Sequence, residues 1–235
     1  MTKPTIPLLL ISVCFGLGCI SIGSSTSFHS DQWRPIEGTK LSGWVQRGGK
    51  ASFIEENGVI TGETRPNQPN SFLCSIKEYS DFELHYEFRV DDELNSGVQI
   101  RSHVRPENDV VYGYQIEIDP SPRAFTGGIY EESGRGWLKD LKDNPDAQKA
   151  FKHGEWNHIR VIAQGDHIQT WLNGVLAANL FDNATAKGFI ALQVHGVGDR
   201  EQPLKVQWRK IRIQELPPDS DVANRPSSTP EKDPK

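Results

Sequence analysis

Strict alternation of apolar and polar residues is the feature that most restricts how this chain can fold. Residues 82–90 read FELHYEFRV, in which every second side chain is apolar. A period of two places the apolar side chains on one face of an extended strand and the polar ones on the other. The same behaviour recurs in residues 97–101, 112–119, 157–163, 167–172, 175–180, 188–195 and 203–216. The chain is therefore predicted to be all-β, with strands that bury one face.

Turn signals between these segments predict that the strands pair antiparallel. Three dipeptides supply the positive φ angles that tight hairpin turns require: Asn57-Gly58, Gly165-Asp166 and Asn173-Gly174. In the last segment the apolar phase slips between Trp208 and Ile211, which predicts a β-bulge near Arg209 or Lys210.

A single short helix is expected at residues 144–151, because Asn144 can cap it and Pro145 suits its first turn. The other elements are about ten short strands without a repeat, and no strands alternate with helices. We therefore predict an antiparallel β-sandwich or jelly roll with one short helix.

The two ends differ in composition from the middle of the chain. Residues 1–27 hold an apolar run behind Lys3, which predicts an export signal with its linker. The run ends in Gly18-Cys19, the pattern of a lipid anchor at Cys19, although ordinary cleavage near Gly23 or an uncleaved anchor helix would also fit. Residues 217–235 are Pro-rich and predicted to be disordered. One domain at 28–216 remains, exported to the periplasm or the cell surface.

Charge and cysteine content argue against a nucleic-acid-binding protein and against a domain held by disulfide bonds. The formal net charge is −5, and the basic residues are scattered, so the chain lacks the basic patch that nucleic-acid binding needs. Of 3 cysteines, Cys14 precedes Cys19 in the leader, and Cys74 alone lies in the predicted domain. Cys74 is expected to be a small core residue, and the domain must be held by its core without an internal disulfide.

Polar residues on the predicted strands form a candidate site. Gln115, Glu117 and Asp119 share one face of strand 112–119, and carboxylates spaced i, i+2 stand about 6–7 Å apart. Such a pair can bracket a sugar or share a cation. By the same rule Gln99 projects with Arg101, and Gln193 with His195.

A solvated outer face of a sandwich would show the same alternation, so this interpretation stays open beside the functional one. Two features favour a site: the strand at 112–119 carries acids but no Lys, and His195 lies just before Gly196, at a predicted sheet rim. Trp137 lies in a Gly-rich segment that is typical of a mobile loop carrying an aromatic platform.

Eight ordered blocks resemble a known family: LSGW at 41–44, YSDFELHYEFR at 79–89, NSGVQIR at 95–101, GYQIEID at 113–119, TGGIY at 126–130, GEWNHIRV at 154–161, WLNG at 171–174 and GFIALQVHG at 188–196. This is the 3-keto-disaccharide hydrolase domain family, which the chain resembles over about residues 32–216. The resemblance implies a concanavalin-like jelly roll that cleaves glycosides whose sugar carries a ketone at C3. The implied partner is a carbohydrate.

The resemblance also implies roles for the candidate residues. His195 is expected to act as base or acid, Arg101 to contact the carbonyl or oxyanion, and Glu117 with Asp119 to do acid/base work. The two carboxylates are also candidate ligands of a divalent cation such as Ca²⁺, since hard cations take oxygen ligands. Substrate contacts are expected from Asn95, Gln99, Gln115, Tyr130, Trp137 and Gln193.

Two rival functions remain at this stage. Laminarinase-type glucanases share the sandwich and place a second Glu shortly after the Glu-x-Asp pair, but here Pro120-Ser121-Pro122 follows Asp119. Direct two-carboxylate hydrolysis of unoxidised glycosides is therefore disfavoured. The other rival is a lectin-like module that binds carbohydrate without catalysis.

Overall fold

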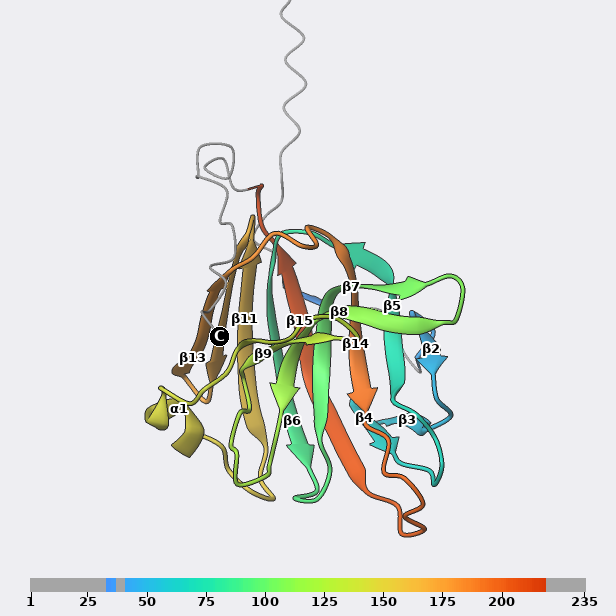
Figure 1. Cartoon of the computed structure of the whole chain (residues 1–235). Helices are drawn as coiled ribbons and strands as arrows, with labels where there is room; N and C mark the ends of the chain where they lie inside the picture. The colour runs from blue at the N-terminus through green and yellow to red at the C-terminus, as the bar shows by residue number, and fades with distance from the viewer. Residues whose placement is uncertain (1–32, 37–40, 219–235) are drawn as a thin grey trace, which may run out of the picture.

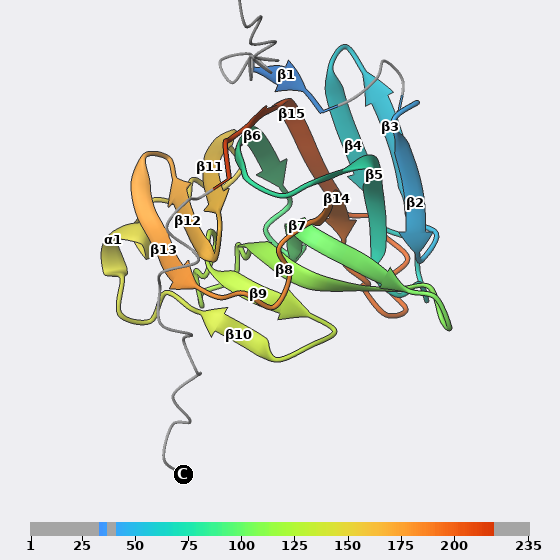
Figure 2. The same cartoon turned by 90° about the horizontal axis from the view of Figure 1, so that it is seen from above.

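The computed structural model describes residues 33–36 and 41–218 and has two layers of antiparallel strands (Figures 1 and 2). Within these residues the larger sheet has eight strands: β13 (Val175–Phe181), β12 (His167–Leu172), β11 (Asn157–Gln164), β6 (Phe82–Val90), β15 (Lys205–Glu215), β4 (Val59–Glu63) and β3 (Ser52–Glu56), with β1 (Arg34–Pro35) beside β15. The smaller sheet has seven: β10 (Gly136–Lys139), β9 (Ile129–Glu132), β8 (Val110–Ile118), β7 (Ser96–Arg105), β14 (Gly188–Val194), β5 (Ser71–Tyr79) and β2 (Trp44–Gly48). The predicted all-β sandwich is confirmed.

Alternation along the strands builds the core between the two sheets. The apolar side chains of β6 face those of β8, so that Leu84 and Phe88 are buried in the same cluster as Ile116 and Ile118. The polar side chains of β8 consequently point away from the core, on the outer face of the seven-stranded sheet.

The predicted helix and bulge are both confirmed. Helix α1 (Pro145–Lys149) begins at Asn144, whose side-chain oxygen accepts a hydrogen bond from the Ala147 N–H at 3.2 Å. The register between β15 and β6 shifts between Arg209 and Arg212, and Lys210 has a φ of 51°. The bulge lets β15 continue although its apolar phase slips.

The segment around Trp137 forms a β-hairpin, whereas a loop was predicted there. Positive φ angles at Ser133 and Gly136, 51° and 83°, turn the chain so that β10 pairs with β9. The predicted leader at 1–27 and nearly all of the predicted tail at 217–235 lie outside the described residues. No helix within the described part is long and apolar enough to cross a bilayer.

Cys74 is buried in a small apolar cluster with Phe72 and Phe189, which confirms its prediction as a core residue. Burial raises the pKa of the thiol to about 12. We expect Cys74 in the native protein to resist iodoacetamide at mildly alkaline pH and to react once the protein is unfolded, because the thiolate is the nucleophile. Peptide mapping of the labelled protein tests this, and labelling of Cys74 before unfolding would contradict it.

Candidate active site

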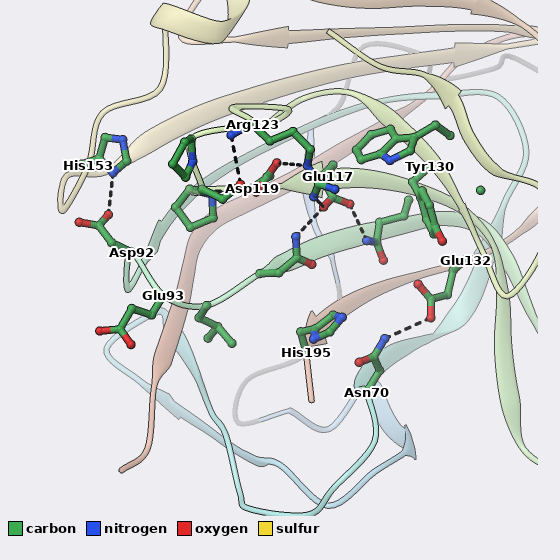
Figure 3. Close-up of a pocket in the computed structure, with 18 residues that line it drawn as sticks. Asn70, Asp92, Glu93, Glu117, Asp119, Arg123, Tyr130, Glu132, His153 and His195 are labelled. Atoms are coloured by element: carbon green, nitrogen blue, oxygen red, sulfur yellow. Dashed lines mark hydrogen bonds and ion pairs between the residues drawn. The ribbon is translucent and has the colours of Figure 1, made fainter. Parts of the chain in front are cut away.

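A pocket of about 1130 Å³ opens on the outer face of the seven-stranded sheet (Figure 3). Ligand pockets commonly measure about 300–1,000 Å³, so this one has room for more than a single sugar ring. Strands and the segments that connect them supply its lining: Asp92–Asn95 after β6, Gln115 and Glu117 on β8, Asp119–Arg123 after β8, Tyr130 and Glu132 on β9, Gly136 and Trp137 on β10, and Asn70, His153 and His195 from three further connecting segments.

Glu117 lies in the wall of this pocket and is 3% exposed. Its Oε1 accepts a hydrogen bond from Asn95 Nδ2 at 2.6 Å, and its Oε2 accepts one from Gln115 Nε2 at 2.9 Å. Burial raises the pKa of Glu117, outweighing these amide donors, which favour the ionised form. Glu117 can therefore hold a proton more tightly than an exposed glutamate.

Arg123 is the cation of the pocket. Its Nε donates to Asp119 Oδ2 at 2.7 Å, and its Nη2 lies 3.7 Å from Glu117 Oε1. The guanidinium also lies 5.2 Å from the ring centre of Trp137, so a cation–π contact holds it in place. Arg123 thus brings a positive charge next to the two predicted carboxylates.

The carboxylates do not form the predicted cation site. The oxygens of Asp119 accept hydrogen bonds from Arg123 and from backbone N–H groups of Ser121 and Phe125. Among the described residues no group of three or more His, Cys, Asp or Glu side chains could hold a metal ion. Ca²⁺ needs six to eight oxygen ligands, and the groups around this pair are instead N–H donors.

Glu132 is a half-buried carboxyl in the pocket that the sequence analysis missed. Asn70 Nδ2 donates to Glu132 Oε1 at 3.2 Å, and Gln193 Nε2 lies 3.4 Å from Oε2. Partial burial raises the pKa of Glu132, and this effect outweighs the hydrogen bond from Asn70 and the nearby His195, which both favour the ionised form. The period of two was the available signal, because Glu132 shares its strand face with Tyr130, which was selected.

His195 lies at the pocket rim, directly after β14. Its Nδ1 is 2.8 Å from the backbone carbonyl oxygen of Gly196. A carbonyl only accepts, so in the neutral ring Nδ1 carries the proton and Nε2 is the basic nitrogen. Glu117, Glu132 and His195 surround the same space in Figure 3.

Arg101 lies outside the pocket, and its predicted contact with the substrate is wrong. Its backbone φ is 45°, and the register of β7 against β8 shifts between Ile100 and His103. This irregularity breaks the alternation that would have placed Arg101 beside Gln99. The buried guanidinium instead donates to the carbonyl oxygens of Ser80 and Gly165 and to Asp81 Oδ1, at 2.6, 2.7 and 2.9 Å.

Gln99 and Gln193 are fully buried and do not line the pocket, which corrects their prediction as substrate contacts. Each supports a side chain that does line it. Gln99 Nε2 donates to Gln115 Oε1 at 2.6 Å, and Gln193 Nε2 lies next to Glu132. By contrast, Asn95, Gln115, Glu117, Asp119, Tyr130, Trp137 and His195 all line the pocket.

The raised pKa values of Glu117 and Glu132 affect how the free energy of unfolding depends on pH. Where burial raises the pKa of a carboxyl, the folded state binds its proton more tightly than the unfolded chain, so that contribution to stability is lost as the pH rises through the folded pKa. We expect Glu132→Gln, which cannot ionise, to lose less free energy of unfolding than the wild type between about pH 4 and about pH 8, a range that begins near the usual glutamate pKa. Urea unfolding at both pH values measures this, and an equal loss in the two proteins would contradict it.

The two-sheet sandwich has a galectin-like and concanavalin-like fold, which confirms the predicted concanavalin-like sandwich. The chain belongs to the 3-keto-alpha-glucoside-1,2-lyase-like domain family, whose family model matches residues 32–214. This match confirms the family resemblance and indicates a carbohydrate-related function. No curated protein matches the chain significantly.

Solved structures with the same fold support the class. A candidate glycosyl hydrolase from Parabacteroides distasonis aligns with a TM-score of 0.54 and 23% identity, over 79% of this chain and 100% of that one. A protein with a galectin-like fold from Bacillus subtilis aligns at 0.53 and 12%, over 78% and 94%. The carbohydrate binding module CBM66 from Bacillus subtilis aligns at 0.50 and 13%, over 74% and 96%.

Proposed function

We propose that the pocket cleaves 3-keto-glycosides by elimination across C1 and C2, followed by hydration. The ketone at C3 acidifies the hydrogen on C2, so a general base can remove that proton. The C2–H electron pair forms the C1–C2 double bond, the C1–O bond breaks, and the leaving oxygen takes a proton from an acid. Water then adds its oxygen to C1 and a proton returns to C2, so the net reaction is hydrolysis.

The observation that carries this proposal is a pair of glutamates that line one pocket on neighbouring strands β8 and β9: Glu117, which is buried, and Glu132, which is half-buried. Burial raises the pKa of both, so each can hold a proton for a leaving oxygen and take one back once ionised. The family description supports the bond that is cleaved, because a 1,2-lyase eliminates between C1 and C2.

The remaining roles follow from the chemistry of the lining. Nε2 of His195 is the base for the C2 proton, and Glu117 is the acid for the leaving oxygen. Arg123 takes the part first assigned to Arg101, since its guanidinium faces the pocket and can stabilise the enolate oxygen. Asn95 and Tyr130 position sugar hydroxyls.

A deuterium experiment tests the mechanism. The purified protein is incubated in D₂O with a 3-keto-glucoside and, separately, with its unoxidised parent. Elimination and hydration should give product only from the keto sugar, with deuterium at C2 beyond the exchange in an enzyme-free control. Product from the parent alone, or product that keeps its C2 hydrogen, would rule out elimination. Product from neither sugar would rule out this enzymatic function.

Carbohydrate binding without catalysis is the second candidate, favoured by the fold shared with a carbohydrate binding module. Calorimetric titration with disaccharides separates the two functions. A pure binding module binds and never turns over, whereas the proposed enzyme turns over keto sugars.

Export is also part of the proposal, with Cys19 as the lipid-carrying residue and the periplasm or cell surface as the location. Its support is the apolar run that ends in Gly18-Cys19. Expression in a bacterial host with labelled palmitate should label the wild type but not Cys19→Ser. Label in neither protein would favour ordinary cleavage.

A further inference from the structure

A chain of buried side-chain hydrogen bonds ends on Glu117. Ser102 Oγ donates to Gln99 Oε1 at 2.9 Å, Gln99 Nε2 donates to Gln115 Oε1 at 2.6 Å, and Gln115 Nε2 donates to Glu117 Oε2 at 2.9 Å. Ser102 and Gln99 are 0% exposed and Gln115 is 2% exposed. These groups depend on one another for hydrogen bonds, because water reaches almost none of them.

The backbone holds the two amides face to face. Gln99 and Gln115 are direct partners in the register of β7 and β8. Gly97, the partner of Glu117, leaves room for Gln115 to reach along the sheet, since a Cβ at position 97 would lie 2.5 Å from Gln115 Cδ. A glutamine amide donates from one side and accepts on the other, so the orientation of Gln115 determines which of these it presents to Glu117.

The donating orientation suits an ionised Glu117, whose two oxygens can only accept. A protonated Glu117 can instead donate its own O–H, and an amide turned by 180° would present its oxygen to receive it. If Gln115 turns, Gln99 must turn as well, and its Nε2 then donates to Ser102 Oγ.

The reversal is possible at Ser102 because its hydroxyl can donate to other acceptors nearby. The carbonyl oxygens of Ile100 and Tyr114 lie 3.0 and 3.3 Å from Ser102 Oγ. The hydroxyl proton can rotate to one of them while the oxygen accepts from Gln99. Every contact along the chain is thus satisfied in both directions.

We propose that Ser102, Gln99 and Gln115 are positioning residues that reverse their hydrogen bonds together each time Glu117 gains or loses a proton. Both states of Glu117 then keep a full set of partners, and neither leaves a buried polar group unpaired. We call these three residues the relay. Its role in catalysis rests on the proposed function: the relay lets Glu117 give a proton in the elimination and recover one in the hydration.

Other charged or titratable groups line the same pocket: Asp119 and Arg123 after β8, Tyr130 and Glu132 on β9, Asp92 and Glu93 after β6, His153 after α1, and His195 after β14. Of these, the charge of Asp119 raises the pKa of Glu117 and that of Arg123 lowers it. Gln99 and Ser102 do not line the pocket, so the orientation of the relay follows Glu117 itself.

Neutron diffraction without substrate tests the relay independently of activity. The pH at the midpoint of the Glu117 titration is first measured by ¹³C NMR of its carboxyl carbon, and the Glu117→Gln variant assigns the signal. Deuterium-exchanged crystals of the protein are then examined below and above that pH. Above it, deuterons on Gln115 should point to Glu117 and the Ser102 deuteron to Gln99. Below it, all three groups should be reversed. The same orientation in both crystals would overturn the proposal even if the enzyme is active.

Kinetics give a second, separate test. Ser102→Ala should lower kcat on a 3-keto-glycoside about tenfold, the effect of about one lost hydrogen bond, with KM little changed. Ser102→Thr, which keeps the hydroxyl, should retain most of the wild-type kcat. The matched control is Ser96→Ala, an equally buried serine on the same strand that donates to the carbonyl of Gln193 at 2.7 Å. Equal effects of Ser102→Ala and Ser96→Ala would contradict the relay, whereas absence of turnover in the wild type would contradict only the proposed function.

Discussion

Glu117→Gln is expected to lower kcat on a 3-keto-glycoside by about 10²–10⁴-fold, the usual contribution of a general acid or base. Glutamine has nearly the same shape and can take the hydrogen bonds of a protonated carboxyl, but it cannot transfer the proton. Binding of the sugar and the free energy of unfolding should therefore change little. Steady-state kinetics, calorimetric titration and urea unfolding measure the three quantities.

The matched control for this prediction is Glu131→Gln. Glu131 precedes Glu132 on β9, pairs with Arg135 and does not line the pocket. Its replacement should leave kcat within about twofold of the wild type, which is within the small effects of surface substitutions. A Glu117→Gln variant with normal turnover would show that another group supplies the proton.

Arg101→Met is expected to lower the free energy of unfolding by about 3–5 kcal/mol, as for other buried ion pairs broken on one side. The Arg101 side chain is 0% exposed, and its loss leaves Asp81 without its ion-pair partner and deprives two carbonyl oxygens of this donor. Because Arg101 lies outside the pocket, the protein that remains folded should keep its KM. Urea unfolding and kinetics on the same preparation test both statements.

An exposed arginine provides the comparison for Arg101. Arg47 pairs with Asp109 at 3.3 Å, and its side chain is 44% exposed. Arg47→Met should cost at most about 1 kcal/mol, because solvent screens exposed pairs. Similar losses for the two variants, or a large rise in KM for Arg101→Met, would contradict the structural role of Arg101.

Much of the fold could be predicted because its signals are local. Alternation over 82–90 required only that one face be buried, and β6 follows it residue by residue. The slip around Lys210 and the cap at Asn144 are also short-range features of backbone geometry. On β8 the same period placed Gln115 and Glu117 on one face, and both line the pocket.

The period of two fails where the backbone departs from a regular strand. Nothing in the sequence around Arg101 marks its positive φ, so the alternation assigned it to the wrong face. Arg123 was not selected, because it lies in a loop whose path back toward Asp119 depends on hydrogen bonds to that carboxyl. Glu132 gains its importance from Asn70, which is distant in the sequence.

The sequence by itself determined the all-β class, the burial of alternate side chains, the turns and the family, because each depends on neighbours along the chain. Only the tertiary structure decided which polar residues share a pocket, which cation faces it, and which amides donate hydrogen bonds to Glu117. The physical reason is that burial and hydrogen-bond partners come from strands far apart in sequence, and these set the pKa of a carboxyl and the direction of its hydrogen bonds.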